Sequence, residues 1–226
     1  MPQNRRLEMK ATKRTIITTL FSSEDDSHTY EVRKEIDGDK SKVAVVIMLY
    51  PSISAATINH CDNTTQSIVD HMEDIGVGTV RIINLFSKVC SARMSTRSIK
   101  LDQENLKYIE GVMKEKGSSD FIWIFAWGSS MSACAVANQT KRIIINIMAK
   151  YLPETKPQQF TVDELDMKNE KAIHPLFLKI RHGNTAWELE EYIIPKELIE
   201  EPVKGPATEI KDLRKGKVKD VSQNSK

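Results

Sequence analysis

Short apolar runs separated by polar stretches make up most of the chain. Over residues 14–20 and 29–36, β-branched and polar residues alternate, and the segment 22–27 between them is polar. This alternation predicts two half-buried strands that form a hairpin at the edge of a sheet. The next run, 42–49, is apolar after its first residue. A run of this kind predicts a strand that is buried on both faces.

Helical spacing begins after the polar loop 51–63. The apolar positions that recur at this spacing are Ile68, Val69, Met72 and Ile75. The glycines of segment 76–78 end this predicted helix, and residues 79–85 form the next predicted strand. Asp102 is a favourable N-cap for a second helix. The apolar stripe of that helix consists of Leu106, Ile109, Val112 and Met113.

A third central strand is predicted over residues 121–126. After a turn at Trp127 we expect the chain to enter a long helix that ends near Tyr151, and two strand-like pieces follow near 159–162 and 173–178. Strands that alternate with helices predict an α/β fold. We expect a three-layer α/β/α sandwich on a mainly parallel sheet, with an N-terminal β-hairpin.

Composition and charge divide the chain into a body and two basic ends. Its 226 residues are 40% hydrophobic and 28% charged, which is typical of a soluble protein with one substantial core. We expect one domain over 14–199, a basic arm over 1–13 and a basic tail with little order over 200–226. Residues 1–14 hold five basic residues against one acidic, and residues 203–226 hold seven against three, so each end is +4 and the remainder is −6. Such ends can follow a nucleic-acid backbone, or they can simply keep the termini solvated.

The three cysteines, Cys61, Cys90 and Cys134, are widely spaced and form no Cys-x-x-Cys pair. This spacing supports neither a disulfide framework nor a structural zinc site, and it indicates reduced thiols in a reducing compartment. No signal sequence opens the chain, and no apolar run approaches the ~20 residues that a membrane span needs. We therefore expect a cytoplasmic protein with no membrane contact, no metal and no other cofactor.

Four segments place polar or aromatic residues where a predicted strand gives way to a loop. They are Leu49-Tyr50-Pro51-Ser52, Ile83-Asn84-Leu85-Phe86, Ala126-Trp127-Gly128-Ser129 and His174-Pro175-Leu176-Phe177-Leu178. The ends of the strands are where an open α/β sheet builds its binding crevice. Their order along the chain predicts a single site assembled from several strand ends.

The same four segments resemble the uracil-DNA glycosylase superfamily. Its members carry a polar residue before a proline that activates water, a strand-end Asn, a Leu-Trp-Gly-Ser segment and a His-Pro-Ser-Pro-Leu loop. The chain is more similar to an uncharacterised bacterial and phage domain family, whose pattern runs Met-Leu-Asn-Pro-Ser, Asp-x-Thr, Asn-Leu-Phe, Ala-Trp-Gly and His-Pro-Leu-Tyr-Leu. The likeness spans residues 20–180. It implies a DNA glycosylase that flips a modified or unusual base and excises it, with removal of modified bases from phage DNA as the setting.

Cleavage of an N-glycosidic bond needs a donor to the departing base and a pocket for the extruded base. The resemblance gives the donor role to His174; otherwise this histidine only binds loop backbone. Asn84 carries a donor and an acceptor on one amide, which suits a base edge, but a strand-end amide also suits loop backbone. Phe86 is expected to stack on the base or to belong to the core.

Each of the remaining site residues has a functional and a purely structural interpretation. Trp127 and Gly128 shape the turn, and the Ser129 and Ser130 amides at the expected helix start bind a phosphate or only cap the helix. Leu176 and Leu178 lie where the superfamily wedges a side chain into the duplex, and packing is the alternative. Phosphates are expected on the basic loop 87–101 and on the two ends.

Tyr50 is the main departure from the superfamily, which has Asp or Asn directly before Pro51. A tyrosine is a poor general base, so Asp62, His60 or Asn59 would have to activate the water, unless the sugar cation needs little help or nothing is hydrolysed. Asp62 is alternatively a helix N-cap. Tyr50 would line the pocket with Pro51 and Ser52. A non-catalytic module that binds nucleotides or nucleic acid, and an N-glycosidase for free nucleosides or nucleotides, are the other hypotheses.

Overall fold

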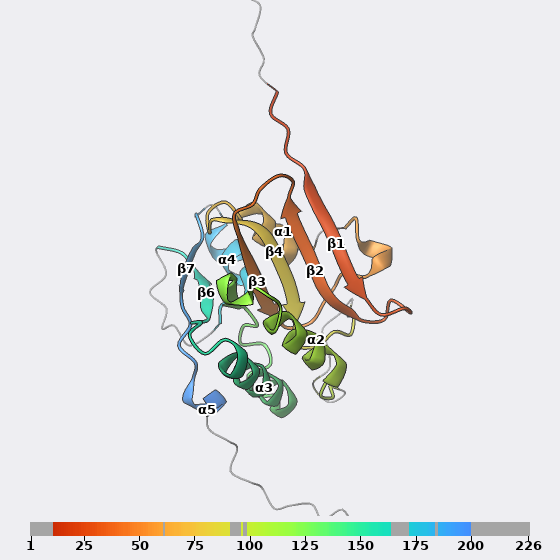
Figure 1. Cartoon of the computed structure of the whole chain (residues 1–226), viewed down its shortest axis with the longest axis vertical. Coiled ribbons are helices and arrows are strands. Elements are labelled where there is room, and N and C mark those ends of the chain that lie inside the picture. Colours follow the sequence, from red (N-terminus) through yellow and green to blue (C-terminus); the bar gives the residue numbers. More distant parts are fainter. Residues whose placement is uncertain are drawn as a thin grey trace, which may run out of the picture.

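The computed structural model describes residues 11–60, 62–90, 96, 99–163, 172–183 and 185–199. Its strands form one mixed sheet in the order β1-β2-β4-β3-β5-β6-β7 (Figure 1). The strands are β1 (Ile16–Ser22), β2 (Thr29–Ile36), β3 (Lys42–Met48), β4 (Val77–Asn84), β5 (Ile122–Phe125), β6 (Gln158–Thr161) and β7 (Glu188–Glu191). Strands β4, β3, β5 and β6 are parallel to one another, whereas β1, β2 and β7 join at the two sides in antiparallel pairing.

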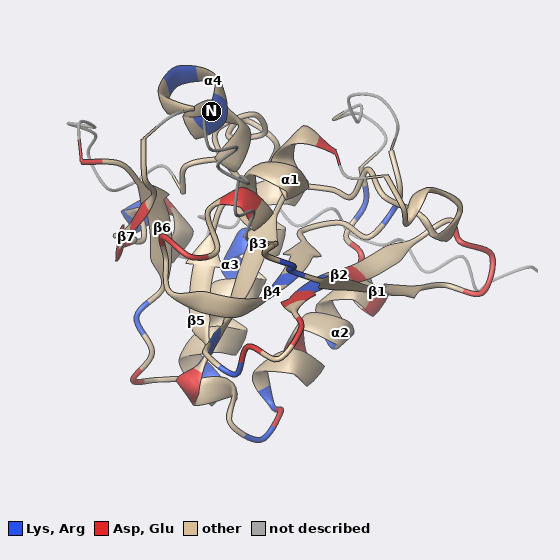
Figure 2. Ribbon diagram, turned by 90° about the horizontal axis from the view of Figure 1, so that it is seen from above, with Lys and Arg blue, Asp and Glu red and all other residues tan. Residues whose placement is uncertain are grey.

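Helices cover both faces of this sheet. They are α1 (Asn63–Asp70), α2 (Gln103–Met113), α3 (Ala135–Tyr151), α4 (Pro175–His182) and α5 (Lys196–Ile199). Helices α1 and α4 lie on one side and α2 on the other (Figure 2). Helix α3 packs beside α2. The α/β class, the parallel centre and the N-terminal hairpin that the sequence predicts are confirmed.

The central strands explain both the core and the crevice. In β3, Val45 and Ile47 belong to the cluster on the α2 and α3 side, while Ala44 and Val46 belong to the cluster on the α1 and α4 side, and all four side chains are fully buried. The chain leaves β3 toward α1, but it leaves β4 and β5 toward the opposite face. Loops that diverge in this way open a crevice at the carboxyl end of the strand between them.

The segment 173–178 is a helix and not the strand that the sequence predicts. Pro175 occupies the first turn of α4, where its missing N–H costs nothing, and His174 is the N-cap. Leu178 is fully buried against the α1 side of the sheet, whereas Ile180 is 70% exposed. The apolar run therefore reflects one helical turn that packs on the core, because apolar runs this short do not distinguish a strand from a buried helix.

Two further predictions of secondary structure were wrong. The long helix starts at Ala135 with Cys134 as its N-cap, so the four residues 131–134 separate Ser130 from the helix, and the two serines do not lie at its start. Strand β7 was missed, because its sequence, Glu-Leu-Glu-Glu, is short and acidic and its pairing with β6 is what makes it a strand.

The expected arm and tail fall almost entirely outside the described residues, since residues 1–10 and 200–226 are not among them. No helix in the described ranges is long and apolar enough to cross a membrane. Within the same ranges no group of three or more His, Cys, Asp or Glu side chains could hold a metal ion.

Candidate functional site

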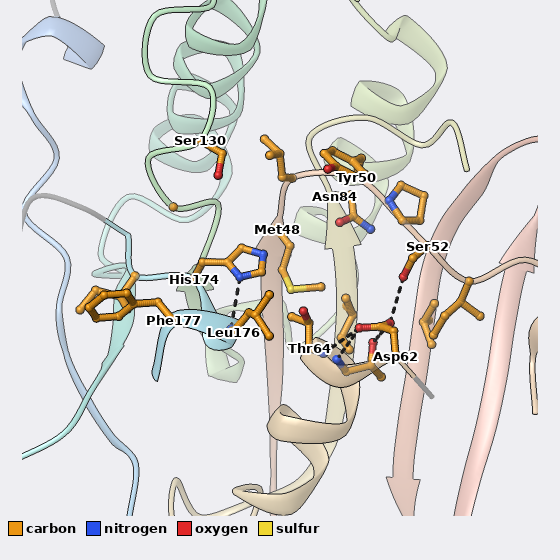
Figure 3. Close-up of a pocket in the computed structure, with 18 of the residues that line it drawn as sticks. Met48, Tyr50, Ser52, Asp62, Thr64, Asn84, Ser130, His174, Leu176 and Phe177 are labelled. Atoms are coloured by element: carbon orange, nitrogen blue, oxygen red, sulfur yellow. Dashed lines mark hydrogen bonds between the residues drawn. The ribbon is translucent and has the colours of Figure 1, made fainter. Parts of the chain in front are cut away.

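A pocket of about 650 Å³ opens at the carboxyl ends of β3 and β4 (Figure 3). It collects residues from all four segments that the sequence singles out. Its lining consists of Val32, Met48, Leu49, Tyr50, Pro51, Ser52, Ile53, Asp62, Thr64, Thr65, Ile82, Asn84, Gly128, Ser129, Ser130, Ile173, His174, Leu176, Phe177 and Ile180. A concave site with apolar walls and a few polar groups is the usual form of a small-molecule or base-binding site.

His174 reaches the pocket from the N-terminus of α4. Its Nδ1 accepts a hydrogen bond from the Leu176 N–H at 3.2 Å, which makes the side chain the cap of the helix. A ring nitrogen that accepts carries no proton, so in the neutral ring Nε2 is the N–H donor. Burial lowers the pKa of His174, against the opposing charge of Asp62. The imidazole is therefore neutral at neutral pH, and its remaining N–H has no hydrogen-bond partner among the residues that the structure describes.

Gly128 fixes where this imidazole lies. Its φ is +63°, and a Cβ built on it would lie 3.0 Å from the Cβ of His174. The Gly128 N–H also donates to the Ala172 carbonyl at 2.8 Å, and Ala172 itself has a φ of +46°. The turn after β5 and the turn before α4 thus touch directly, which requires a residue without a side chain at position 128.

Asn84 ends β4 and contributes its amide to the wall of the pocket. Its side chain is 2% exposed, and the structure gives its Oδ1 no hydrogen-bond partner among the described residues. The Asn84 carbonyl accepts from Asn105 Nδ2 at 2.7 Å, so the backbone of this strand end is held in place. An unpaired buried amide oxygen is costly, and a ligand with a donor would satisfy it.

Asp62 lines the opposite side of the pocket and caps α1. Its carboxylate accepts four hydrogen bonds, from the Thr64 and Thr65 amides and from the hydroxyls of Thr65 and Ser52. Burial alone would raise the pKa of Asp62, but these hydrogen bonds outweigh it and hold the pKa below its ordinary value. Four donors fill the lone-pair positions of a carboxylate. The geometry favours the capping role over general-base catalysis.

The segment Tyr50–Ser52 is anchored by its neighbours. The Phe86 N–H donates to the Leu49 carbonyl at 3.2 Å, and the Cys90 N–H donates to the Pro51 carbonyl at 3.0 Å. Tyr50 is half-buried and packs on the core cluster beside Asn84 (Figure 3). Pro51 and Ser52 are brought to the pocket as predicted, and Ser52 faces Asp62.

Several predicted residues lie away from the pocket. Phe86 and Trp127 are 3% and 2% exposed and belong to the core cluster on the α2 and α3 side. Leu178 is buried on the face of α4 that packs against the core. Asn59 and His60 are exposed and do not line the pocket.

Several lining residues were given no role from the sequence, and two of them are exposed apolar residues of α4. Phe177 and Ile180 lie three residues apart on α4 and are 40% and 70% exposed. Their spacing marks one face of a helix, a signal that is legible only once residues 175–182 are assigned as helical.

The basic residues near the pocket lie outside its described lining. None of the described residues that line the pocket is Lys or Arg. The last turn of α4 carries Lys179 and Arg181, which Figure 2 shows as blue segments on that helix. In the predicted basic loop, Lys88 and Lys100 are exposed, while residues 91–95, 97 and 98 lie outside the described part of the chain.

A family model described as "Protein of unknown function (DUF1643)" matches residues 30–188. The chain therefore belongs to this family, and the matched range includes β4, the pocket and α4. No curated protein and no solved structure matches the chain.

Proposed function

We propose that this member of the DUF1643 family is a DNA glycosylase that hydrolyses the N-glycosidic bond of a modified or unusual base. The observation that carries the proposal is the pairing of two groups in one pocket. Among the described residues, Asn84 supplies a buried amide oxygen without a partner, and His174 supplies a neutral ring whose second N–H has no partner. The sequence likeness to the uracil-DNA glycosylase superfamily supports both the chemistry and a three-layer fold of that type.

In the proposed reaction the C1′–N bond breaks and its electron pair leaves with the base. The His174 Nε2–H donates a hydrogen bond to the base oxygen on which negative charge develops. This hydrogen bond lowers the barrier, and no proton is transferred from a protonated histidine. A water oxygen bonds to C1′, one of its protons goes to solvent, and the departed base takes up a proton. The products are the free base and an abasic sugar.

The pocket suits a nucleobase but not the phosphate groups of a nucleotide. A cavity of about 650 Å³ with apolar walls accepts a flipped heterocycle, and the absence of Lys and Arg from its described lining leaves phosphate charge unmatched inside. Lys179 and Arg181 lie at the end of α4, outside the pocket, where they would meet a DNA backbone. This distribution favours a polynucleotide over a free nucleotide as substrate.

A second function, binding of an extruded base without cleavage, is favoured by one observation. Asp62 is the carboxylate that lines the pocket, and its four hydrogen bonds leave it no position for a water. Tyr50 stands where the superfamily has its water-activating residue. In the catalytic proposal the sugar cation therefore captures a water held by neutral groups. The reaction follows the same steps but is slower than with a carboxylate base.

The two functions separate in one assay. Purified protein is incubated with single- and double-stranded DNA that contains uracil, hypoxanthine or hypermodified cytosine, and released base and alkali-labile abasic sites are measured. We expect release from at least one substrate. His174→Ala should lower that rate by about 100-fold or more, in the range observed when an oxyanion donor is removed. His182→Ala, a histidine on the same helix that does not line the pocket, is the matched control and should keep the rate.

Binding of these DNAs without release of any base would replace the glycosylase by the binding module. An unchanged rate in His174→Ala would remove the histidine from the reaction. If the protein neither binds these DNAs nor releases a base from them, both functions are rejected.

A further inference from the structure

Strand β1 is an open edge of the sheet. It pairs with β2 on one side, and no strand in the described part of the chain pairs with its other side. Its sequence, Ile-Ile-Thr-Thr-Leu-Phe-Ser, holds no charge and no proline, and Ile16 and Ile17 are 42% and 45% exposed. Natural proteins usually protect such edges with charges, prolines or bulges. The register of β1 with β2 shifts at its end, between Phe21 and Ser22, so residues 16–21 before this shift are the part of the edge that offers a template for another strand.

The two ends of β1 carry opposite charges. Lys13 and Arg14 precede the strand, whereas Glu24 and Asp25 follow it in the turn to β2. In an antiparallel pair the start of one strand lies beside the end of the other. In an antiparallel pair of two β1 strands, the acidic end of each copy therefore lies beside the basic end of the other. This charge pattern favours a second copy of the chain as the partner of the edge.

We propose that β1 is the interface of a homodimer, in which two copies pair antiparallel and join their sheets into one. A two-fold axis through Thr19 sets the register. It places Ile17 opposite Phe21 of the second copy, with Arg14 near its Glu24 and Lys13 near its Asp25. The interface is isologous, which is the commonest form of soluble dimer.

The faces of the strand agree with this register. Phe21 contacts Tyr108 of α2 at a ring distance of 6.4 Å, so odd positions of β1 point to the α2 side. Thr18 accepts from Lys34 on the opposite side. Ile17 and Phe21 thus share a face, and antiparallel pairing places them together as a β-branched and aromatic pair, one of the favourable cross-strand combinations. Arg14 also binds Glu73 of its own chain at 2.8 Å, and its five donors leave room for a second carboxylate.

One strand per copy makes a small interface, so we expect reversible dimerisation in the micromolar range. The family model begins at residue 30, after β1. The proposal is therefore made for this chain rather than for the family, and it is independent of the function proposed for the pocket.

Charge exchange tests the pairing directly. Arg14→Glu and Glu24→Arg each place like charges opposite each other in a homodimer, so each should raise the dimer dissociation constant about tenfold in sedimentation velocity experiments. An equimolar mixture of the two variants restores both attractions and should dimerise as well as the wild type. Lys196→Glu on α5, which lies far from β1 in Figure 1, is the matched control and should leave the constant unchanged.

Ile17→Lys tests the edge itself, because a lysine is a common guard of edge strands. Because the Ile17 side chain is exposed, the substitution should leave the fold intact, and circular dichroism would verify this. We expect a monomer, together with loss of concentration-dependent protection of β1 amides from hydrogen exchange. A wild-type protein that stays monomeric up to several hundred micromolar, or a mixture of the charge variants that fails to recover, would overturn the proposal.

Discussion

At the scale of single residues, His174 links the stability of α4 to the chemistry of the pocket. Its Nδ1 caps the helix only while it is unprotonated. Burial lowers its pKa, so in the acidic range the unfolded chain takes up a proton more readily than the folded one. The contribution of His174 is therefore complete above the ordinary histidine pKa of about 6.5, and stability falls as the pH drops below it.

His174→Asn should remove this dependence while it keeps a capping acceptor. We expect the free energy of unfolding of the wild type to fall more steeply than that of the variant between about pH 7 and about pH 5. Urea titrations at a series of pH values measure both slopes. The contributions of the other histidines to the pH dependence cancel in the comparison, because both proteins contain them. Parallel slopes would mean that His174 is not held neutral by its cap.

Gly128 gives a second prediction at this scale. Gly128→Ala places a side chain in the left-handed region and against the Cβ of His174, and it should cost about 1–2 kcal/mol of stability. Gly38→Ala is the matched control, because Gly38 has a φ of +78° but no atom within 4 Å of the added Cβ. Both variants share the backbone cost. Only Gly128→Ala should move the NMR signals of the His174 ring, and equal shifts in the two variants would argue against the contact.

At the scale of elements, the N-cap of α1 decides how Asp62 is understood. Asp62→Asn keeps an oxygen that can accept from the Thr64 and Thr65 amides, whereas Asp62→Ala removes it. We expect the alanine variant to lose about 1 kcal/mol or more of unfolding free energy in urea and the asparagine variant to lose much less. Base release, where it occurs, should survive in Asp62→Asn. Loss of release in a variant of normal stability would return Asp62 to the reaction.

The elements also show where sequence reasoning succeeded. Asn84 and His174 are placed at the pocket because strand ends and a His-Pro step are local signals, and local signals persist in the fold. Strand β7 and helix α4 were not predicted correctly, since pairing with β6 and packing of Leu178 on the sheet decide them. Such tertiary effects override the preferences of short segments.

At the scale of the whole molecule, a buried charge pair illustrates the same limit. Glu31 of β2 is fully buried and binds Arg81 of β4 at 2.7 Å. These residues are fifty positions apart, and only the antiparallel register that pairs Arg33 with Arg81 brings them together. No pattern within either strand identifies the partner, so the pair is visible only in the assembled sheet.

The charge distribution of the whole chain gives the last prediction. Residues 203–226 carry seven basic residues against three acidic ones, while the pocket lining that the structure describes has no Lys or Arg. If the proposed DNA binding uses this segment, each lost phosphate contact should flatten the plot of log association constant against log salt by about 0.9. Replacing its seven basic residues by Gln should therefore weaken binding of every DNA sequence equally and reduce the slope. Fluorescence anisotropy over a range of salt concentrations measures this, with Lys179→Gln on α4 as a single-contact reference. A slope that does not change would assign the backbone contacts to the folded domain alone and leave the segment as a solvated end.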